Sequence, residues 1–111
     1  SKPQQKIISY TDIEPEALVH QIDPKLAEQF LERILGSKGD LKNHLDTLQA
    51  FFDSNLNIKE AANKLYIHRN TLIYRLNKIK LESGYDPQNF KDAFALQLVI
   101  WLFNRISSPP H

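Results

Sequence analysis

The stretch NIKEAANKLYIHRNTLIYRLNKIKLE, residues 57–82, decides how this chain folds. Apolar residues recur in it at spacings of three and four, over 58–65 and again from 69 to about 81, and this pattern predicts two α-helices. Asn57 is a favourable N-cap, and Glu60 three residues later completes a start that resembles a capping box. Since the two helices are separated only by a short turn, the stretch predicts a helix-turn-helix.

The small internal core that such a unit requires is present in the sequence. Two short helices that cross steeply leave little room at their closest approach, and Ala62 supplies a small side chain there. The other apolar residues of this core are Leu65, Ile67, Leu72 and Leu76, and Ala61 and Ile79 lie on the same faces of their helices. The turn departs from a common pattern, because Tyr66 stands where many helix-turn-helix units carry a glycine with positive φ.

The second predicted helix has a polar outer face. At 100° per residue, this face lies opposite Leu72 and Leu76. Its residues, with those that flank it and those at the start of the helix, are His68, Arg69, Asn70, Thr71, Tyr74, Arg75, Asn77 and Lys78. Arginine can bind both acceptors of a guanine, and asparagine can pair with an adenine edge. We therefore expect this face to bind double-stranded DNA; the alternative is a solvated face without a ligand.

Separate roles are expected within this set. Phosphate contacts are assigned to Arg75, Lys78 and Thr71, together with the N-terminus of the helix. Base contacts are assigned to Arg69, Asn70 and Tyr74, with His68 assisting, because the N-terminal part of a recognition helix usually reaches the bases. For Tyr74 the alternatives are contact with a sugar or a thymine methyl group, or partial burial; for His68 the alternative is a simple helix cap.

The positive charge of the chain is concentrated in the same stretch. Residues 57–82 carry six basic and two acidic side chains, a net charge of +4, whereas residues 1–56 carry six basic and nine acidic ones. Residues 83–111 carry two of each, which returns the overall charge of +1. This asymmetry favours a nucleic-acid partner more than the charge of the whole chain does.

The motif also resembles a known family. IHRNTLIYRLNKI, preceded by NIKEAANKLY, is similar to the C-terminal helix-turn-helix of the PucR/CdaR group of bacterial regulators, the purine-catabolism and sugar-diacid regulators. The run HRNTLxYRLxxI of that group is intact at residues 68–79, and LDTLQAFFDSNLN before it and ALQLVIWL after it also match. The resemblance covers residues 8 to about 103. More distantly, the unit is similar to the DNA-binding end of Fis.

This resemblance implies the DNA-binding domain of a transcriptional regulator of carbohydrate-diacid or purine catabolism genes. It implies an activator more often than a repressor. It also implies that the effector is sensed by a sensor domain in an upstream part of the protein that is missing from this sequence. We expect the domain to be cytoplasmic in a bacterium.

Around the motif, the sequence predicts an all-α fold, a small multi-helix bundle. Residues 13–106 form the helical DNA-binding domain, after a flexible or extended lead-in segment at 1–12 and before a tail at 107–111. Further helices are expected at 12–20, 25–35, 41–54 and about 89–106. The expected apolar residues of the second and third of these are Leu26, Phe30, Leu31 and Ile34, and Leu41, Leu45, Leu48, Phe51 and Phe52.

The last predicted helix is apolar on all sides. Residues 93–103, AFALQLVIWLF, contain one polar side chain, Gln97, so the helix needs cover on more than one side. A homodimer through the surface between Leu96 and Phe103 would supply it, and so would the missing sensor domain. A rival function follows, a protein-interaction module that docks a partner through this helix and binds no nucleic acid.

Other kinds of chemistry find no support in the residues. There is no cysteine, the four histidines are far apart, and the three glycines form no phosphate-binding loop, so we expect no metal, no cofactor and no enzymatic activity. No apolar run is long enough to span a bilayer, and we expect no signal peptide and no membrane partner.

Overall fold

The helices of a computed structural model, which describes residues 14–36 and 41–107, confirm the all-α prediction. Six α-helices and one short 3₁₀ helix (η2) make up this part of the chain, and it contains no strand. The elements are α1 (Pro15–Val19), α2 (Pro24–Leu35), η2 (Leu41–His44), α3 (Leu45–Asp53), α4 (Ile58–Leu65), α5 (Arg69–Ser83) and α6 (Phe90–Ser107). The expected lead-in segment at 1–12 and residues 108–111 of the expected tail lie outside the described residues.

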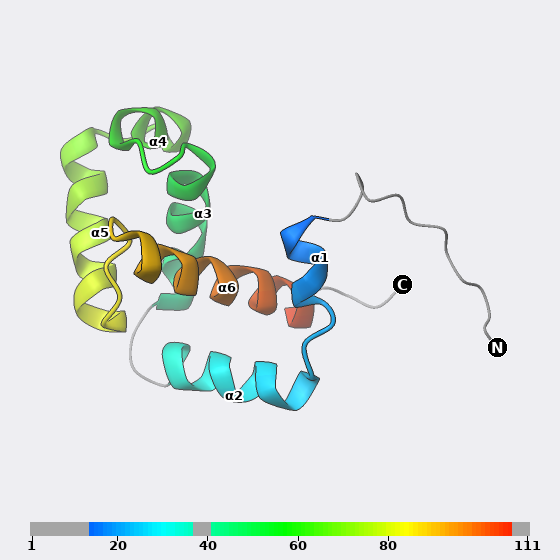
Figure 1. Cartoon of the computed structure of the whole chain (residues 1–111). Coiled ribbons are helices and arrows are strands. Elements are labelled where there is room, and N and C mark those ends of the chain that lie inside the picture. The colour runs from blue at the N-terminus through cyan, green and yellow to red at the C-terminus, as the bar shows by residue number, and fades with distance from the viewer. Residues whose placement is uncertain (1–13, 37–40, 108–111) are drawn as a thin grey trace.

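The C-terminal helix α6 is the axis around which α1, α2 and α3 pack. It crosses the middle of the molecule and contacts α1, α2 and α3 (Figure 1). Helix α3 also contacts α4 and α5, so it joins the helix-turn-helix at one end to the rest of the bundle. The side chains buried at this junction include Leu48, Phe51, Leu72, Leu76 and Leu96, each at most 1% exposed.

The cover that α6 needs comes mainly from the chain itself. Leu96, Val99, Ile100 and Leu102 are buried in the core, and Leu98, Trp101 and Phe103 pack against it while partly exposed. The four buried side chains are therefore not available to a second copy. The large side chains of α6 that stay open are at its two ends: Phe90 and Phe94, and Ile106.

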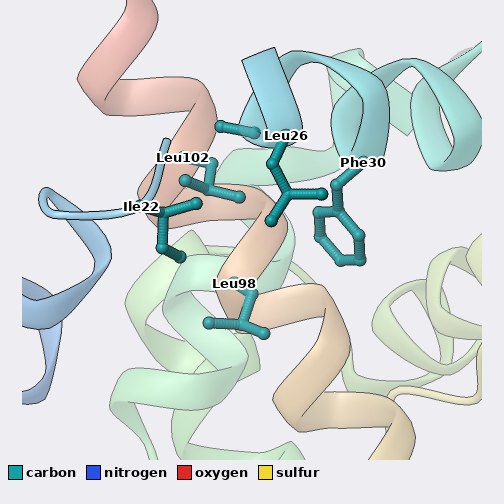
Figure 2. Close-up of a pocket in the computed structure, with 6 residues that line it drawn as sticks. Ile22, Leu26, Phe30, Leu98 and Leu102 are labelled. Atoms are coloured by element: carbon teal, nitrogen blue, oxygen red, sulfur yellow. The ribbon is translucent and has the colours of Figure 1, made fainter. Parts of the chain in front are cut away.

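The buried face of α2 differs from the prediction. Ala27, Leu31 and Ile34 are buried, whereas Leu26 is 59% exposed and Phe30 is half-buried. The small side chain of Ala27 faces α6 and leaves an apolar groove between the two helices. Figure 2 shows this α2–α6 groove, about 210 Å³ in volume, with Leu26 and Phe30 on one wall and Leu98 and Leu102 on the other.

Two predicted helices are shorter than expected. The segment expected to be helical over 12–20 forms α1 only over Pro15–Val19, and residues 12 and 13 lie outside the described residues. The segment expected to be one helix over 41–54 begins with η2 and continues as α3, which ends at Asp53. A tight 3₁₀ turn at a helix start is common and leaves the same apolar residues facing inward. Within α3, Phe51 is fully buried and Phe52 only half-buried.

The turn between α3 and α4 reverses the chain through two left-handed residues. Asn55 has φ 56°, and Leu56 after it has φ 65°. The Leu56 N–H donates to Phe51 O at 3.0 Å and the Asn55 N–H donates to Phe52 O at 3.0 Å, the bond pattern of a Schellman motif. This turn sets the position at which α4 begins.

No helix in the described part of the chain is long and apolar enough to cross a membrane.

Candidate nucleic-acid interface

Helix α4 has the predicted bounds and the predicted cap. The Asn57 side chain accepts a hydrogen bond from the Glu60 N–H at 2.9 Å, which satisfies a donor that the first turn leaves free. Ala61 and Ala62 are 0% and 3% exposed, so small side chains do occupy the tightly packed side of the helix. Figure 1 shows α4 lying across one end of α5.

The turn between α4 and α5 is a second Schellman motif, with a tyrosine at its left-handed position. Tyr66 has φ 57° and ψ 42°. The Ile67 N–H donates to Ala62 O at 3.0 Å, and the Tyr66 N–H donates to Asn63 O at 3.2 Å. The positive φ expected for this turn position is confirmed, and the turn is made without the usual glycine.

We expect Tyr66→Gly to raise the stability of the domain by about 1 kcal/mol. A side chain with a Cβ is strained in the left-handed region, and Tyr66 is 94% exposed, so little packing is lost with its ring. Thermal unfolding followed by circular dichroism should show a rise in Tm of about 4–8 °C. The matched control is Tyr66→Ala, which removes the ring but keeps the Cβ. A rise of the same size in this control would contradict the backbone explanation.

Helix α5 is held by its apolar side and by its two ends. Leu72, Leu76 and Ile79 are at most 1% exposed, as the sequence predicted. The helix continues two residues beyond the expected end, to Ser83, and Gly84 with φ 80° terminates it by donating its N–H to Lys80 O. These contacts hold α5 with its opposite side towards solvent.

The opposite side of α5 carries most of the predicted DNA-binding residues. Asn70, Tyr74 and Asn77 are exposed and lie within about 60° of one another around the helix. Arg69 and Thr71 are exposed beside them in the first turn. The structure thus leaves all five side chains exposed, three of them on one side of the helix and two beside them in its first turn.

Two predicted residues, Arg75 and Lys78, are only half-exposed. They lie on one flank of the open surface, within about 40° of Thr71 around the helix, and part of each long side chain lies against the protein. Long basic side chains commonly bury their stems and leave the charged group in solvent. This position at the edge of the surface suits contact with a phosphate better than contact with a base.

His68 is the N-cap of α5, in agreement with the simple structural alternative for this residue. Its Nδ1 accepts a hydrogen bond from the Asn70 N–H at 3.0 Å. An imidazole that accepts at Nδ1 carries its proton at Nε2 when neutral. The same ring can therefore cap the helix and present an N–H donor in front of it.

The basic side chains of the motif are not equally available. Lys59 and Lys64 on α4 and Arg69 on α5 are exposed. Lys80 lies 3.6 Å from an Asp86 carboxylate oxygen, so its charge is partly neutralised within the chain. The available positive charge is therefore distributed over α4 and the N-terminal two-thirds of α5.

One residue of the open surface was absent from the set predicted from the sequence. Leu81 is 85% exposed and lies on the same side of α5 as Tyr74 and Asn77. Its position four residues after Asn77 was a usable signal, but an apolar residue near a helix end is normally assigned to the core. Among the described residues, no group of three or more His, Asp and Glu side chains gathers as a metal site would require.

Comparisons with known proteins agree with this geometry. Residues 44–102 match the family model of the PucR C-terminal helix-turn-helix domain. The chain is 43% identical to the carbohydrate diacid regulator of Escherichia coli over 56 residues, which is half of this chain. It is 29% identical to the purine catabolism regulatory protein of Bacillus subtilis over 83 residues, 75% of this chain.

The chain spans a minor part of these relatives, 14% and 16% of their lengths, and 26% and 31% of two further B. subtilis proteins. A crystal structure of a regulator of polyketide synthase expression from Bifidobacterium adolescentis has the same fold, with a TM-score of 0.64 at 18% identity. That match covers 88% of this chain and 43% of the other.

Proposed function

Because the chain belongs to the PucR C-terminal helix-turn-helix family, we propose that it is the sequence-specific DNA-binding domain of a bacterial transcriptional regulator. The observation that carries this proposal is the open surface of α5, where Arg69, Asn70 and Tyr74 are all exposed in the N-terminal half of the helix. These side chains can form the bidentate and apolar contacts by which proteins read base edges in the major groove.

In the proposed binding mode, some of these residues contact bases and others contact phosphates. Arg69 and Asn70 in the first turn, with Tyr74 one turn later, contact bases, and the His68 Nε2–H adds a donor at the entrance of the groove. Arg75, Lys78 and Thr71 contact phosphates from one flank. Asn77 completes the polar surface towards the middle of the helix.

The genes controlled are proposed from the two named relatives. Their names point to carbohydrate-diacid and purine catabolism, so we infer a regulator of catabolic genes of one of these kinds, working in the bacterial cytoplasm. That it activates these genes is inferred from the family resemblance of the sequence and not from the names. An effector would be sensed elsewhere in a longer polypeptide, because the relatives are several times longer than this chain.

The rival function, a protein-interaction module without nucleic acid, draws on the α2–α6 groove and on the open aromatic side chains of α6. It does not account for the +4 charge on residues 57–82 or for the polar side chains gathered on α5. Docking of a partner is also compatible with DNA binding, since the groove lies on elements other than α4 and α5.

Substitution of Arg69 tests the proposed reading of bases. Arg69→Ala should weaken binding to the preferred sequence by about 1–3 kcal/mol and relax the preference at one base position. Lys78→Ala should weaken binding by a similar factor on every DNA sequence, preferred or not. Affinities are measured by fluorescence anisotropy on duplexes selected by the wild-type chain from a random library and on scrambled duplexes.

Two controls make this test specific. Arg69→Lys keeps the positive charge but loses the planar fork, so it should lose sequence preference while retaining most of the nonspecific affinity. The Tm of both Arg69 variants should equal that of the wild type because the side chain is exposed. An unchanged preference in Arg69→Ala would remove this residue from the proposed reading of bases.

A further inference from the structure

An aromatic patch at the N-terminal end of α6 is open to solvent. Phe90 and Phe94, one helical turn apart, are 76% and 54% exposed. They face a hollow of about 200 Å³ whose other wall is formed by Phe52, Asn55 and Leu56 at the end of α3. Exposed apolar surface that is concentrated in this way commonly marks a protein contact.

The patch belongs to a longer stripe along α6. At 100° per residue, Phe90, Phe94 and Trp101 lie within about 40° of one another, on the side of the helix away from Leu96 and Val99. Towards the C-terminus this side approaches α1, where Arg105 donates to Val19 O at 2.8 Å and Trp101 is half-buried. Helix α1 thus leaves the N-terminal half of the stripe without cover.

We propose that this half of α6 is the contact between two copies of the chain bound side by side on DNA, with the two α6 helices antiparallel about Phe94. The proposal rests on the proposed function and moves the expected dimer contact from the segment between Leu96 and Phe103, where four side chains are buried, to Phe90 and Phe94. A projecting ring beside a hollow on the same surface is the self-complementary arrangement that a two-fold contact needs.

The size of the patch sets the strength of this contact. A whole aromatic side chain has about 150–250 Å² of surface, so the open parts of Phe90, Phe94 and Leu56 amount to roughly 300 Å² per copy. Two copies bury roughly 600 Å² through them, about half the ~1,200 Å² at the lower end of stable interfaces. The free chain is therefore a monomer, and the contact forms when DNA holds two copies together.

The dimensions of the molecule fit this arrangement. Helix α6, which crosses the described fold, has 18 residues and is therefore about 27 Å long, so two copies lying side by side have centres about 30 Å apart. One turn of B-DNA, which separates the half-sites read by a helix-turn-helix dimer, is about 34 Å. Two copies on one face of the duplex thus bring their α6 patches within reach of each other.

Cooperative binding tests the contact. A half-site is selected from a random duplex library with the wild-type chain, and anisotropy titrations then compare the single half-site with inverted repeats whose centres are 10 or 15 bp apart. The 10-bp repeat should bind the second copy about 5- to 150-fold more tightly than the first, the usual range of coupling between sites. The 15-bp repeat, with copies on opposite faces, should show no such gain.

Phe94→Ser should abolish the gain on the 10-bp repeat and leave half-site affinity unchanged. The matched control is Leu26→Ser, an equally open apolar side chain at the α2–α6 groove, which should keep the gain. Cooperativity that survives in Phe94→Ser, or that is lost only in Leu26→Ser, overturns the proposal. Absence of half-site binding by the wild type would instead contradict the proposed DNA-binding function.

Discussion

Between about 50 and about 200 mM salt, the affinity of this chain for duplex DNA should fall by roughly 40- to 500-fold. Each phosphate neutralised by a basic side chain releases condensed counterions, with a log–log slope of about 0.9 per contact. The open basic side chains on α4 and α5, with the flanking Arg75 and Lys78, allow three to five such contacts, as the sequence alone also suggests. Anisotropy titrations on a duplex of random sequence measure the slope directly.

Single substitutions test whether the salt dependence of the affinity comes from the proposed DNA-binding surface. Lys78→Ala should reduce the slope by about 0.9, the contribution of one phosphate contact. Lys25→Ala removes the same charge from α2, outside the helix-turn-helix, and should leave the slope unchanged. An affinity that stays flat across the salt range, or a slope that responds equally to both variants, would exclude α5 as the source of the electrostatic binding.

Phe51→Ala should destabilise the domain by about 3–5 kcal/mol, the cost of removing a large buried aromatic side chain and leaving a cavity. Phe51 is 0% exposed on α3, the helix that contacts α4, α5 and α6, and its carbonyl accepts the Leu56 N–H that sets the start of α4. Since domains of this size are stable by only ~5–15 kcal/mol, DNA binding should weaken as the folded fraction falls on warming.

The neighbouring ring provides the control. Phe52 is half-buried, and its ring centroid lies 6.0 Å from that of Phe51. Phe52→Ala removes the same atoms from the same helix but leaves much less of a cavity. Chemical denaturation should therefore show a clearly smaller loss of stability in Phe52→Ala. Equal losses in the two variants would mean that Phe51 does not occupy the centre of the core.

The helix-turn-helix was predictable from the sequence because its signals are local. The cap at Asn57, the alanines of α4 and the apolar spacing of Leu72, Leu76 and Ile79 act within a few residues of one another. Tyr66 departs from the glycine that is usual at this turn position, and the turn forms nonetheless with Tyr66 at φ 57°. Most of the open surface of α5 followed from the same spacing, because fixing the buried side of a helix also fixes its exposed side.

Packing between elements that are distant in the sequence was harder to predict from the sequence. The sequence of α2 offers two adjacent apolar sides, and the approach of α6 over the small Ala27 selects the one that leaves Leu26 exposed. In α6, nearly every position is apolar, so the open side depends on where α1, α2 and α3 lie. The half-burial of Lys78 and the exposure of Leu81 likewise depend on neighbours that the spacing along α5 does not reveal.

The hydrogen bond from Arg105 to Val19 O has a practical consequence. It holds the last turns of α6 beside α1, so the first and last helices of the described fold meet on the side away from α5 (Figure 1). A fluorescent protein, an affinity tag or a surface tether joined beyond α1 or α6 therefore lies on the side away from α5. Elements whose ends lie close together also tolerate a permuted chain order, with a new opening placed in an exposed loop. The fold is thus suitable for fusion to other protein domains.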